Sequence, residues 1–163
     1  MANGVEVGDG VGLLRMGDTL IVLWTKPASA ERWACQLSEM QRMAPAHADG
    51  ILVLVLILSV DTPPEAAVRS DMEAALRRMG PQLRRLVAVP LGDSVWLSIM
   101  RTIVRGLIIV SGQSHRHRVG GSVSSGIEQM LEKAGPLTPS KSELLQGIAA
   151  LSLALGLPAS VAA

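Results

Sequence analysis

The sequence predicts an α/β fold built on a mixed, mainly parallel sheet, and two stretches carry that prediction. The first is the run at residues 51–60, which is apolar except for Ser59; its ten residues are too few to cross a membrane and include β-branched side chains that favour a strand. A strand that is apolar on both faces needs cover on both faces, as in the centre of a parallel sheet between helices. The second is a pair of strand-like runs, residues 11–16 and 19–24, joined by Gly17 and Asp18, which predicts an N-terminal antiparallel hairpin.

The first two predicted helices begin at capping residues. Ser29 follows the hairpin and is expected to cap a helix that ends before Pro45. Thr62 follows the central strand and is expected to cap the next helix, closing a capping box with Glu65. We therefore expect one helix on each side of the central strand in the sequence.

The apolar stripe of the second helix keeps helical spacing as far as Leu86, with a kink or a division at Gly80 and Pro81. The further elements expected are a short strand at residues 86–91, a helix capped at residues 92–94 that runs to about residue 110, an edge strand at residues 116–119 and a helix that starts at Ser124 or Ser125.

The last predicted helix begins at a capping box of Ser140 and Glu143, and residues 144–155 carry no charge. A helix that is apolar on nearly every side must be buried, either on its own domain or against a second chain. Because residues 135–139 resemble a linker, we expect a domain at residues 1–135 and an added segment at residues 136–163. The side chains expected to hold a homodimer together are Leu144, Ile148, Leu151 and Leu155.

Composition excludes several classes of function. The single Cys35 excludes an internal disulfide and a cysteine-only metal site. The absence of Phe and Tyr removes the aromatic platforms on which nucleic-acid bases stack, so no specific nucleic-acid partner is expected. His115 and His117 would share one face of a strand, but two ligands without a third make a weak site and no metal is expected. The N-terminal stretch lacks the basic and apolar regions of a secretion signal, so we expect a cytoplasmic protein.

The formal charge of +1 hides a basic central segment, because residues 77–118 hold eight arginines against Asp93 alone. Such a segment can face an anionic partner, and the alternative is that the arginines are the solvated faces of two helices. The candidate contacts with an anionic partner are Arg77, Arg78, Arg84, Arg85, Arg101 and Arg105.

The order of elements resembles a STAS-like domain, in the bacterial branch related to the sporulation anti-sigma-factor antagonist and to lipid-carrier-like domains. The stretches that carry the resemblance lie within residues 11–134: the hairpin, the strand ending in Asp-Thr-Pro-Pro at 61–64, the Arg-rich helix through 80–86, the strand at 87–89, the helix at 96–106 and Gly-Ile-Glu-Gln-Met-Leu at 126–131. The resemblance implies a non-enzymatic module that binds partner proteins. In some members a Ser or Thr at the start of the helix after the central strand is phosphorylated as a switch.

Thr62 is the nearest position to that switch. The Asp-Ser-Ser-Gly-Leu-Gly-like motif usual in the family is missing there, and Pro63 and Pro64 follow instead. Thr62 is therefore interpreted first as an N-cap, with the switch as the alternative.

Two functions remain from the sequence. The first is a regulatory, protein-binding module of STAS-like type. The second is a carrier or sensor of a small apolar or lipid-like ligand, which the Met- and Leu-rich composition favours, with the charge-free last helix as a lid. The sequence contains no nucleotide-binding glycine motif and no nucleophile elbow, so we expect neither an enzyme nor a cofactor.

Overall fold

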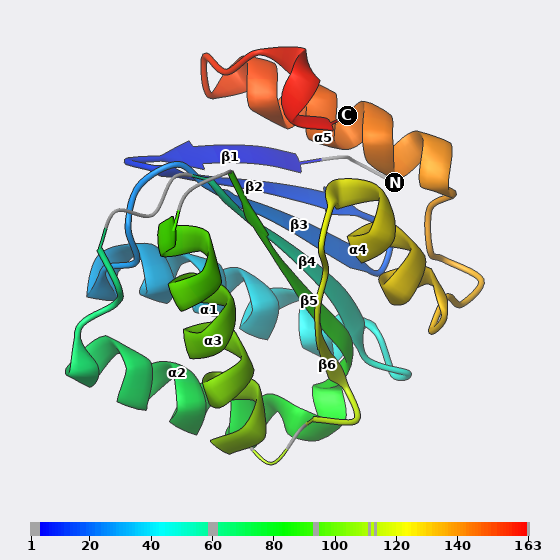
Figure 1. Cartoon of the computed structure of the whole chain (residues 1–163). Helices are drawn as coiled ribbons and strands as arrows, with labels where there is room; N and C mark the ends of the chain where they lie inside the picture. The colour runs from blue at the N-terminus through cyan, green and yellow to red at the C-terminus, as the bar shows by residue number, and fades with distance from the viewer. Residues whose placement is uncertain (1–3, 59–61, 93–94, 111, 113, 163) are drawn as a thin grey trace.

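The computed structural model describes residues 4–58, 62–92, 95–110, 112 and 114–162. Within these ranges six strands form one sheet, and their order across the sheet follows their order along the chain (Figure 1). The strands are β1 (Gly4–Gly8), β2 (Val11–Met16), β3 (Thr19–Trp24), β4 (Ile51–Leu58), β5 (Leu83–Leu91) and β6 (His117–Val119). The pairs β1–β2 and β2–β3 are antiparallel, whereas β3–β4, β4–β5 and β5–β6 are parallel. The predicted mixed, mainly parallel sheet is confirmed.

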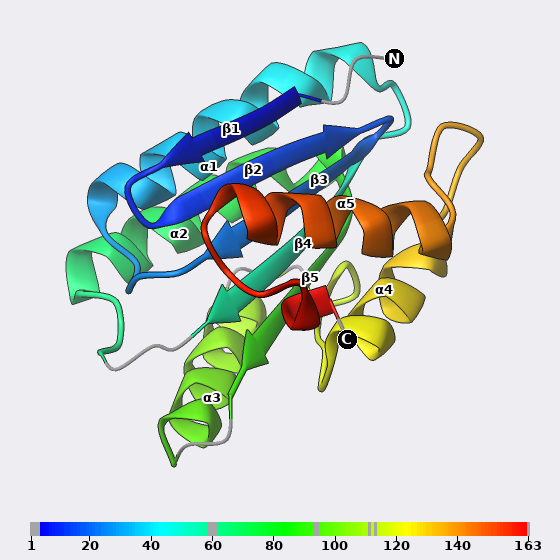
Figure 2. The ribbon, with the colours of Figure 1, turned by 90° about the horizontal axis from the view of Figure 1, so that it is seen from above.

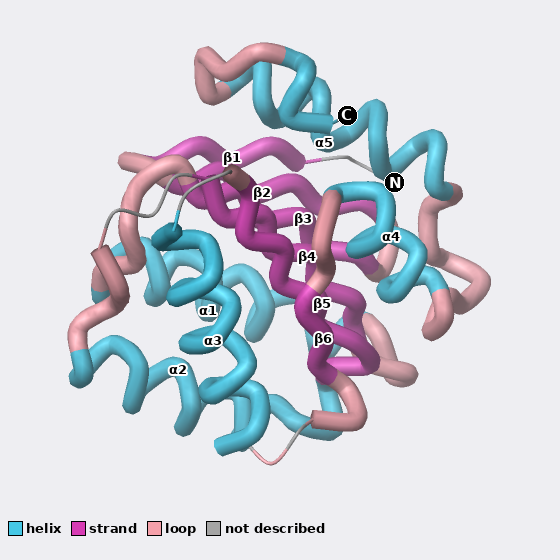
Figure 3. The backbone as a smooth tube through the Cα atoms, viewed as in Figure 1, coloured by secondary structure: helices cyan, strands magenta, loops and turns pink. Residues whose placement is uncertain are grey.

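Helices cover both faces of the sheet. The helices are α1 (Ala30–Met43), α2 (Ala66–Met79), α3 (Val95–Val110), α4 (Val123–Leu131) and α5 (Lys141–Ala154). Figures 1 and 3 show α1, α2 and α3 on one face of the sheet and α4 and α5 on the other. Among the described residues, no helix combines the length and hydropathy that a membrane span needs.

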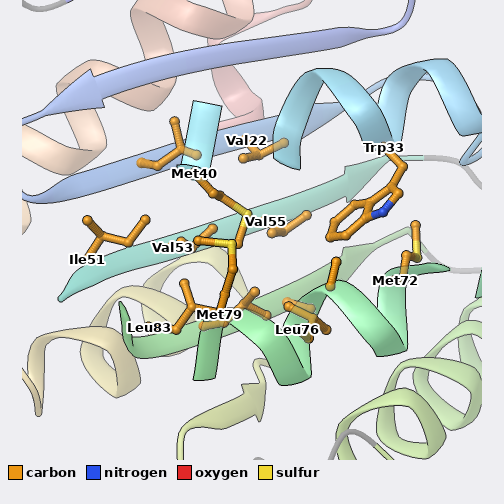
Figure 4. Close-up of a cluster of buried hydrophobic side chains, with 14 of the residues drawn as sticks. Val22, Trp33, Met40, Ile51, Val53, Val55, Met72, Leu76, Met79 and Leu83 are labelled. Carbon is orange, nitrogen blue, oxygen red and sulfur yellow. The ribbon is translucent and has the colours of Figure 1, made fainter. Parts of the chain in front are cut away.

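β4 lies at the centre of the sheet between β3 and β5, as its sequence predicts. Val53 and Val55 point to the α1–α3 face, while Leu54 and Leu56 point to the α4–α5 face, and all four side chains are buried. Figure 4 shows side chains of α1 and α2, among them Trp33, converging over this strand. Because successive side chains of a strand point to opposite faces of the sheet, β4 contributes to two separate apolar layers.

The N-terminal hairpin is also confirmed. β2 and β3 pair around Gly17, which takes a φ of 59°, a left-handed conformation that glycine adopts without steric cost. β1 is an additional edge strand that the sequence pattern does not predict. Its valines, Val5 and Val7, are half exposed, so the strand lacks the strongly apolar pattern by which the others are identified.

Helix α2 begins later than the sequence predicts, and the expected capping box of Thr62 with Glu65 is wrong. The N-cap of α2 is Glu65, whose side chain makes no capping hydrogen bond, and the exposed Thr62 lies three residues before it. The reason is the pair Pro63–Pro64, because a proline disfavours helical backbone in the residue before it. Two successive prolines therefore keep the chain extended from Thr62 onward, and the first helical residue is Ala66.

The next strand is longer than predicted, because β5 begins at Leu83 and not at Leu86. Arg84 and Arg85, which were expected on a helix, therefore lie in the sheet. A register shift between Ile51 and Leu52 of β4 leaves Arg84 as an extra residue in β5.

The sequence predicts that α4 starts at Ser124 or Ser125, but neither residue is its N-cap. Ser122 is the N-cap: its hydroxyl accepts a hydrogen bond from the Ser125 N–H at 3.1 Å, and the Ser125 hydroxyl accepts from the Ser122 N–H at 3.0 Å. The predicted caps Ser29 and Ser140 are confirmed at α1 and α5.

Helix α5 belongs to the cover of the sheet, where it lies over β2 and β3 (Figure 2). Leu144, Ile148 and Leu151 are completely buried in the layer that also contains residues of β2 and α4. The prediction that these three side chains contact a second copy is wrong, because a fully buried side chain has no surface to offer. The fourth expected contact, Leu155, is partly buried against the same layer.

The connection before α5 is attached to the sheet as well. The Thr138 hydroxyl donates a hydrogen bond to Asp18 Oδ2 at 2.9 Å, and the same carboxylate pairs with Arg84 of β5. The helix itself packs closely on β2 at Gly147, where a Cβ would lie 2.6 Å from Met16 Sδ and would displace that side chain. Residues 136–154 thus share contacts with the hairpin rather than standing apart from it.

Candidate functional site

An apolar cavity lies between the sheet and helices α1, α2 and α3. Its volume is about 90 Å³. The lining residues come from β3, α1, β4, α2, β5 and α3, so no single segment forms it. They include Trp24, Trp33, Gln36, Val55, Met72, Ala88, Val104 and Ile108.

The wall of the cavity is almost wholly apolar, but two of the lining residues, Trp24 and Gln36, also carry buried polar atoms. Trp24 Nε1 and Gln36 Oε1 are buried, and neither finds a hydrogen-bond partner among the described residues. The other indole of the cavity differs, because Trp33 Nε1 donates a hydrogen bond to Asp71 Oδ2 at 2.9 Å. Buried polar atoms are nearly always paired, so these two unpaired atoms, on residues that line one cavity, are candidates for pairing with a ligand.

The volume of the cavity indicates what it can hold. A cavity of 90 Å³ exceeds several-fold the roughly 10–15 Å³ that one water needs, and it is somewhat smaller than the roughly 150 Å³ that accommodates benzene. Its walls suit a hydrocarbon body of a few carbon atoms. The two unpaired atoms suit a ligand group that both donates and accepts hydrogen bonds.

The loop before α2 borders this cavity. Pro64 is buried in the lining, and Thr62, two residues earlier, is exposed. The candidate switch residue thus lies two residues along the chain from a lining residue, and it caps no helix. Whether Thr62 is modified stays a prediction.

A second, larger hollow of about 580 Å³ lies at the carboxyl ends of β4 and β5, the edge at which parallel sheets commonly bind ligands. Arg101 and Ser122 line it. The amides of Ser122 and Ser125 at the start of α4 already bond to serine hydroxyls, which reduces the donors available to an anion. Asp93 and Ser94, the predicted cap of α3, lie outside the described residues.

The structure disperses the candidate arginines over the molecule. Arg85 is buried on the α4–α5 face, where Glu132 is 3.4 Å away. Arg77 donates a hydrogen bond to the Val110 carbonyl at 2.7 Å, which joins the ends of α2 and α3. The remaining four are Arg78, exposed on α2, Arg84, paired with Asp18, Arg101, at the second hollow, and Arg105, exposed on α3. They do not form one basic surface.

Arg105 instead borders a groove of about 220 Å³ between the end of α3 and the edge strand β6. The groove is lined by Arg105, Ile108, Ile109, His117, Arg118 and Val119. His117 is 1% exposed, and neither ring nitrogen finds a partner among the described residues. Burial lowers the pKa of His117 from its ordinary value of 6.5 to about 4, and the nearby His115 and Arg116 act in the same direction. The imidazole is therefore neutral at pH 7.

The two histidines do not share a strand face as the sequence predicts. His117 is the first residue of β6, whereas the exposed His115 lies in the preceding turn. Within the described residues, no group of three or more His, Cys, Asp or Glu side chains lies close enough to hold a metal ion. Burial raises the pKa of the Cys35 thiol, with Glu6 and Glu39 acting in the same direction, which disfavours a reactive thiolate.

Neither polar atom of the cavity was predicted from the sequence. Gln36 carried a usable signal, because it lies three residues after Trp33 and four before Met40, on the apolar stripe of α1. Trp24 carried none, since the last residue of a buried strand is an ordinary place for an indole.

No protein-family model and no curated protein sequence matches this chain. Among solved structures, the chain is similar to the crystal structure of an uncharacterized protein of the DUF3478 family from Shewanella loihica PV-4, described as having a SpoIIAA-like fold. The two sequences are 13% identical, the match covers 79% of this chain and 92% of the other, and the TM-score is 0.50. A likeness at this identity concerns the fold alone. With its mixed sheet and its two helical layers, this chain has a SpoIIAA-like, that is STAS-like, α/β fold.

Proposed function

We propose that this chain is a non-enzymatic binding module that takes a small apolar molecule bearing one hydroxyl group into the cavity beneath α1, α2 and α3. The observation that carries the proposal is the combination of an apolar wall with two unpaired polar atoms, the donor Trp24 Nε1 and the acceptor Gln36 Oε1. A hydroxyl group donates one hydrogen bond and accepts two, so an alcohol can satisfy either atom. A hydrocarbon would leave both unpaired, and a cation would lose its hydration without a counter-charge.

A regulatory function through a partner protein is the second candidate, and helix α3 favours it. One side of α3 contributes Met100, Val104 and Ile108 to the cavity wall, while Ile99 and Ile109 are exposed on it. A ligand beneath such a helix can alter the surface above it, and exposed apolar side chains are typical of protein contacts. The STAS-like fold supports this candidate only as a likeness of architecture.

Calorimetric titration of the full chain with isobutanol tests the ligand proposal. The molecule has five non-hydrogen atoms, so we expect a dissociation constant of about 1 mM, which corresponds to roughly 0.8 kcal/mol per atom and lies within the range for small ligands. Isobutylamine has the same body and a positive charge, and it should not bind.

Two variants make the titration specific to the cavity. Ala88→Leu adds side-chain volume to the lining and should abolish isobutanol binding, whereas Ala150→Leu, on the exposed side of α5, should leave it unchanged. Because Ala88→Leu can disturb packing, Gln36→Leu provides an independent test, with an expected loss in affinity of about tenfold. Equal affinity for the alcohol in all three variants would refute the proposed site.

A further inference from the structure

We propose that the groove between the end of α3 and β6 binds a small carboxylate with an apolar body, at a site distinct from the cavity. Arg105 of α3 and Arg118 of β6 are its cationic residues, and Ile109 and Val119 lie beside them. The groove encloses about 220 Å³, more than the cavity. Ile108 lines both spaces and therefore forms a shared wall.

The two arginines are available to an anion. Within the described part of the chain, neither Arg105 nor Arg118 forms an ion pair with a carboxylate, although Arg15, Arg32, Arg42, Arg84 and Arg85 do. Arg118 uses Nη1 to donate to the carbonyls of Ser114 and His117, at 2.6 and 3.0 Å. These bonds hold the guanidinium against the strand, and the described structure shows no bond from its Nε or Nη2.

His117 supplies the second, independent observation. His117 is buried and is one of the residues that line the groove, yet both ring nitrogens lack partners among the residues that the structure describes. A neutral imidazole carries one N–H donor and one acceptor nitrogen. A carboxylate oxygen in the groove can accept from the donor, which would explain why a polar ring is kept at this buried position.

The composition of the groove selects the class of anion. Ile108, Ile109 and Val119 offer hydrocarbon contacts that inorganic phosphate cannot use. Arginine forms its best-defined pairs with planar carboxylates, through two parallel N–H donors. Two cations and one neutral donor therefore suit a monoanion with a branched or short apolar body.

A second copy of this chain is a poorer occupant. β6 is a sheet edge whose outer side is unpaired in the described structure, so two copies could pair edge to edge. A two-fold pairing of β6 with itself would bring Arg118 of each copy close to its counterpart, and like charges facing each other are destabilising. The positive charge of Arg105 and Arg118 therefore favours an anion over a second copy of the chain as the occupant of the groove.

Titration of the full chain with sodium isobutyrate at low ionic strength tests the proposal, followed by calorimetry and by the NMR signals of the His117 ring. We expect a dissociation constant of about 1 mM and shifts of the ring signals. Arg105→Gln and Arg118→Gln should each weaken binding about tenfold or more, since each removes a charge-assisted contact. Arg78→Gln, which removes an exposed arginine of α2, is the matched control and should leave the affinity unchanged.

Three outcomes would overturn the proposal: no isobutyrate binding, equal affinity in the groove variants and in Arg78→Gln, or inorganic phosphate binding as tightly as isobutyrate. Isobutanol separates this site from the cavity. Its binding should depend on Gln36 and not on Arg118, so the failure of one site leaves the other measurable. A loss of isobutanol binding alone would contradict the cavity proposal and leave the groove intact.

Discussion

Gln36 is buried on the apolar stripe of α1 with its amide oxygen unpaired among the described residues. Its amide nitrogen has only a weak contact, with Met40 Sδ at 3.6 Å. We predict that Gln36→Leu raises the free energy of unfolding by about 1 kcal/mol, because it removes an unsatisfied acceptor from an apolar site. Urea denaturation measures the change, and Gln41→Leu, exposed on the same helix, should stay within about 0.5 kcal/mol of the unmodified chain. A clear destabilisation by Gln36→Leu would mean that the amide oxygen is bonded in the folded chain.

His117 makes stability depend on pH. Its pKa is about 4 in the folded chain and near 6.5 when unfolded, so between these values the unfolded chain binds a proton that the folded chain does not. The contribution of His117 is therefore complete above pH 6.5 and is lost as the pH falls toward 4, by about 3 kcal/mol in total. We predict that His117→Leu flattens this part of the pH profile in urea denaturation, whereas His115→Leu retains it. Parallel profiles for the unmodified chain and His117→Leu would contradict the buried, neutral ring.

At the scale of elements, helix α5 covers β2 and β3, although the sequence predicts that it belongs to an added segment outside the domain. We predict that Ile148→Ala lowers the free energy of unfolding by about 2–5 kcal/mol, because it opens a cavity in a fully packed layer. Leu153→Ala on the same helix removes a side chain that is 63% exposed and should change stability by no more than about 0.5 kcal/mol. Thermal or urea unfolding of the two variants measures the contrast. Equal, small effects would mean that α5 is an attachment outside the core.

The elements with a single physical cause could be predicted from the sequence. β4 is apolar on both faces, a pattern that a strand covered on both sides accommodates best, and Gly17 marks the hairpin turn. The predicted start of α2 is wrong because Pro63 and Pro64 oppose helical backbone in the residues before them, which outweighs the capping preference of Thr62. The predicted β5 was too short because Arg84, the extra residue at the register shift, breaks the alternation by which a strand is identified.

The candidate sites could not be predicted, because each is lined by residues that come from several helices and strands far apart in the sequence. The lining residues of the cavity come from three strands and three helices, among them Trp24 of β3, Gln36 of α1 and Val104 of α3. The burial of His117 depends on α3 passing beside a short edge strand. A single sequence does not show which elements lie next to one another in the folded chain.

At the scale of the whole molecule, the sheet separates two unlike layers. In the α4–α5 layer Ile127, Met130 and Leu144 are fully buried, and the hollow of about 580 Å³ lies at its edge, where Val123 lines it. The α1–α3 layer contains the apolar cavity, and Ile108 of α3 lies between that cavity and the groove beside β6. Both proposed binding sites therefore lie on the α1–α3 side of the sheet, while the packed side chains of the α4–α5 layer stabilise the fold.

The methyl NMR spectrum of the full chain during titration with isobutanol tests this division most directly. We predict that the methyl signals of Val55, Ala88 and Val104, which line the cavity, shift together and saturate. The methyl signals of Ile127, Leu144 and Ile148, on the opposite face, should stay in place. An unchanged spectrum at concentrations well above about 1 mM, or equal shifts on both faces of the sheet, would contradict a ligand site beneath α1, α2 and α3.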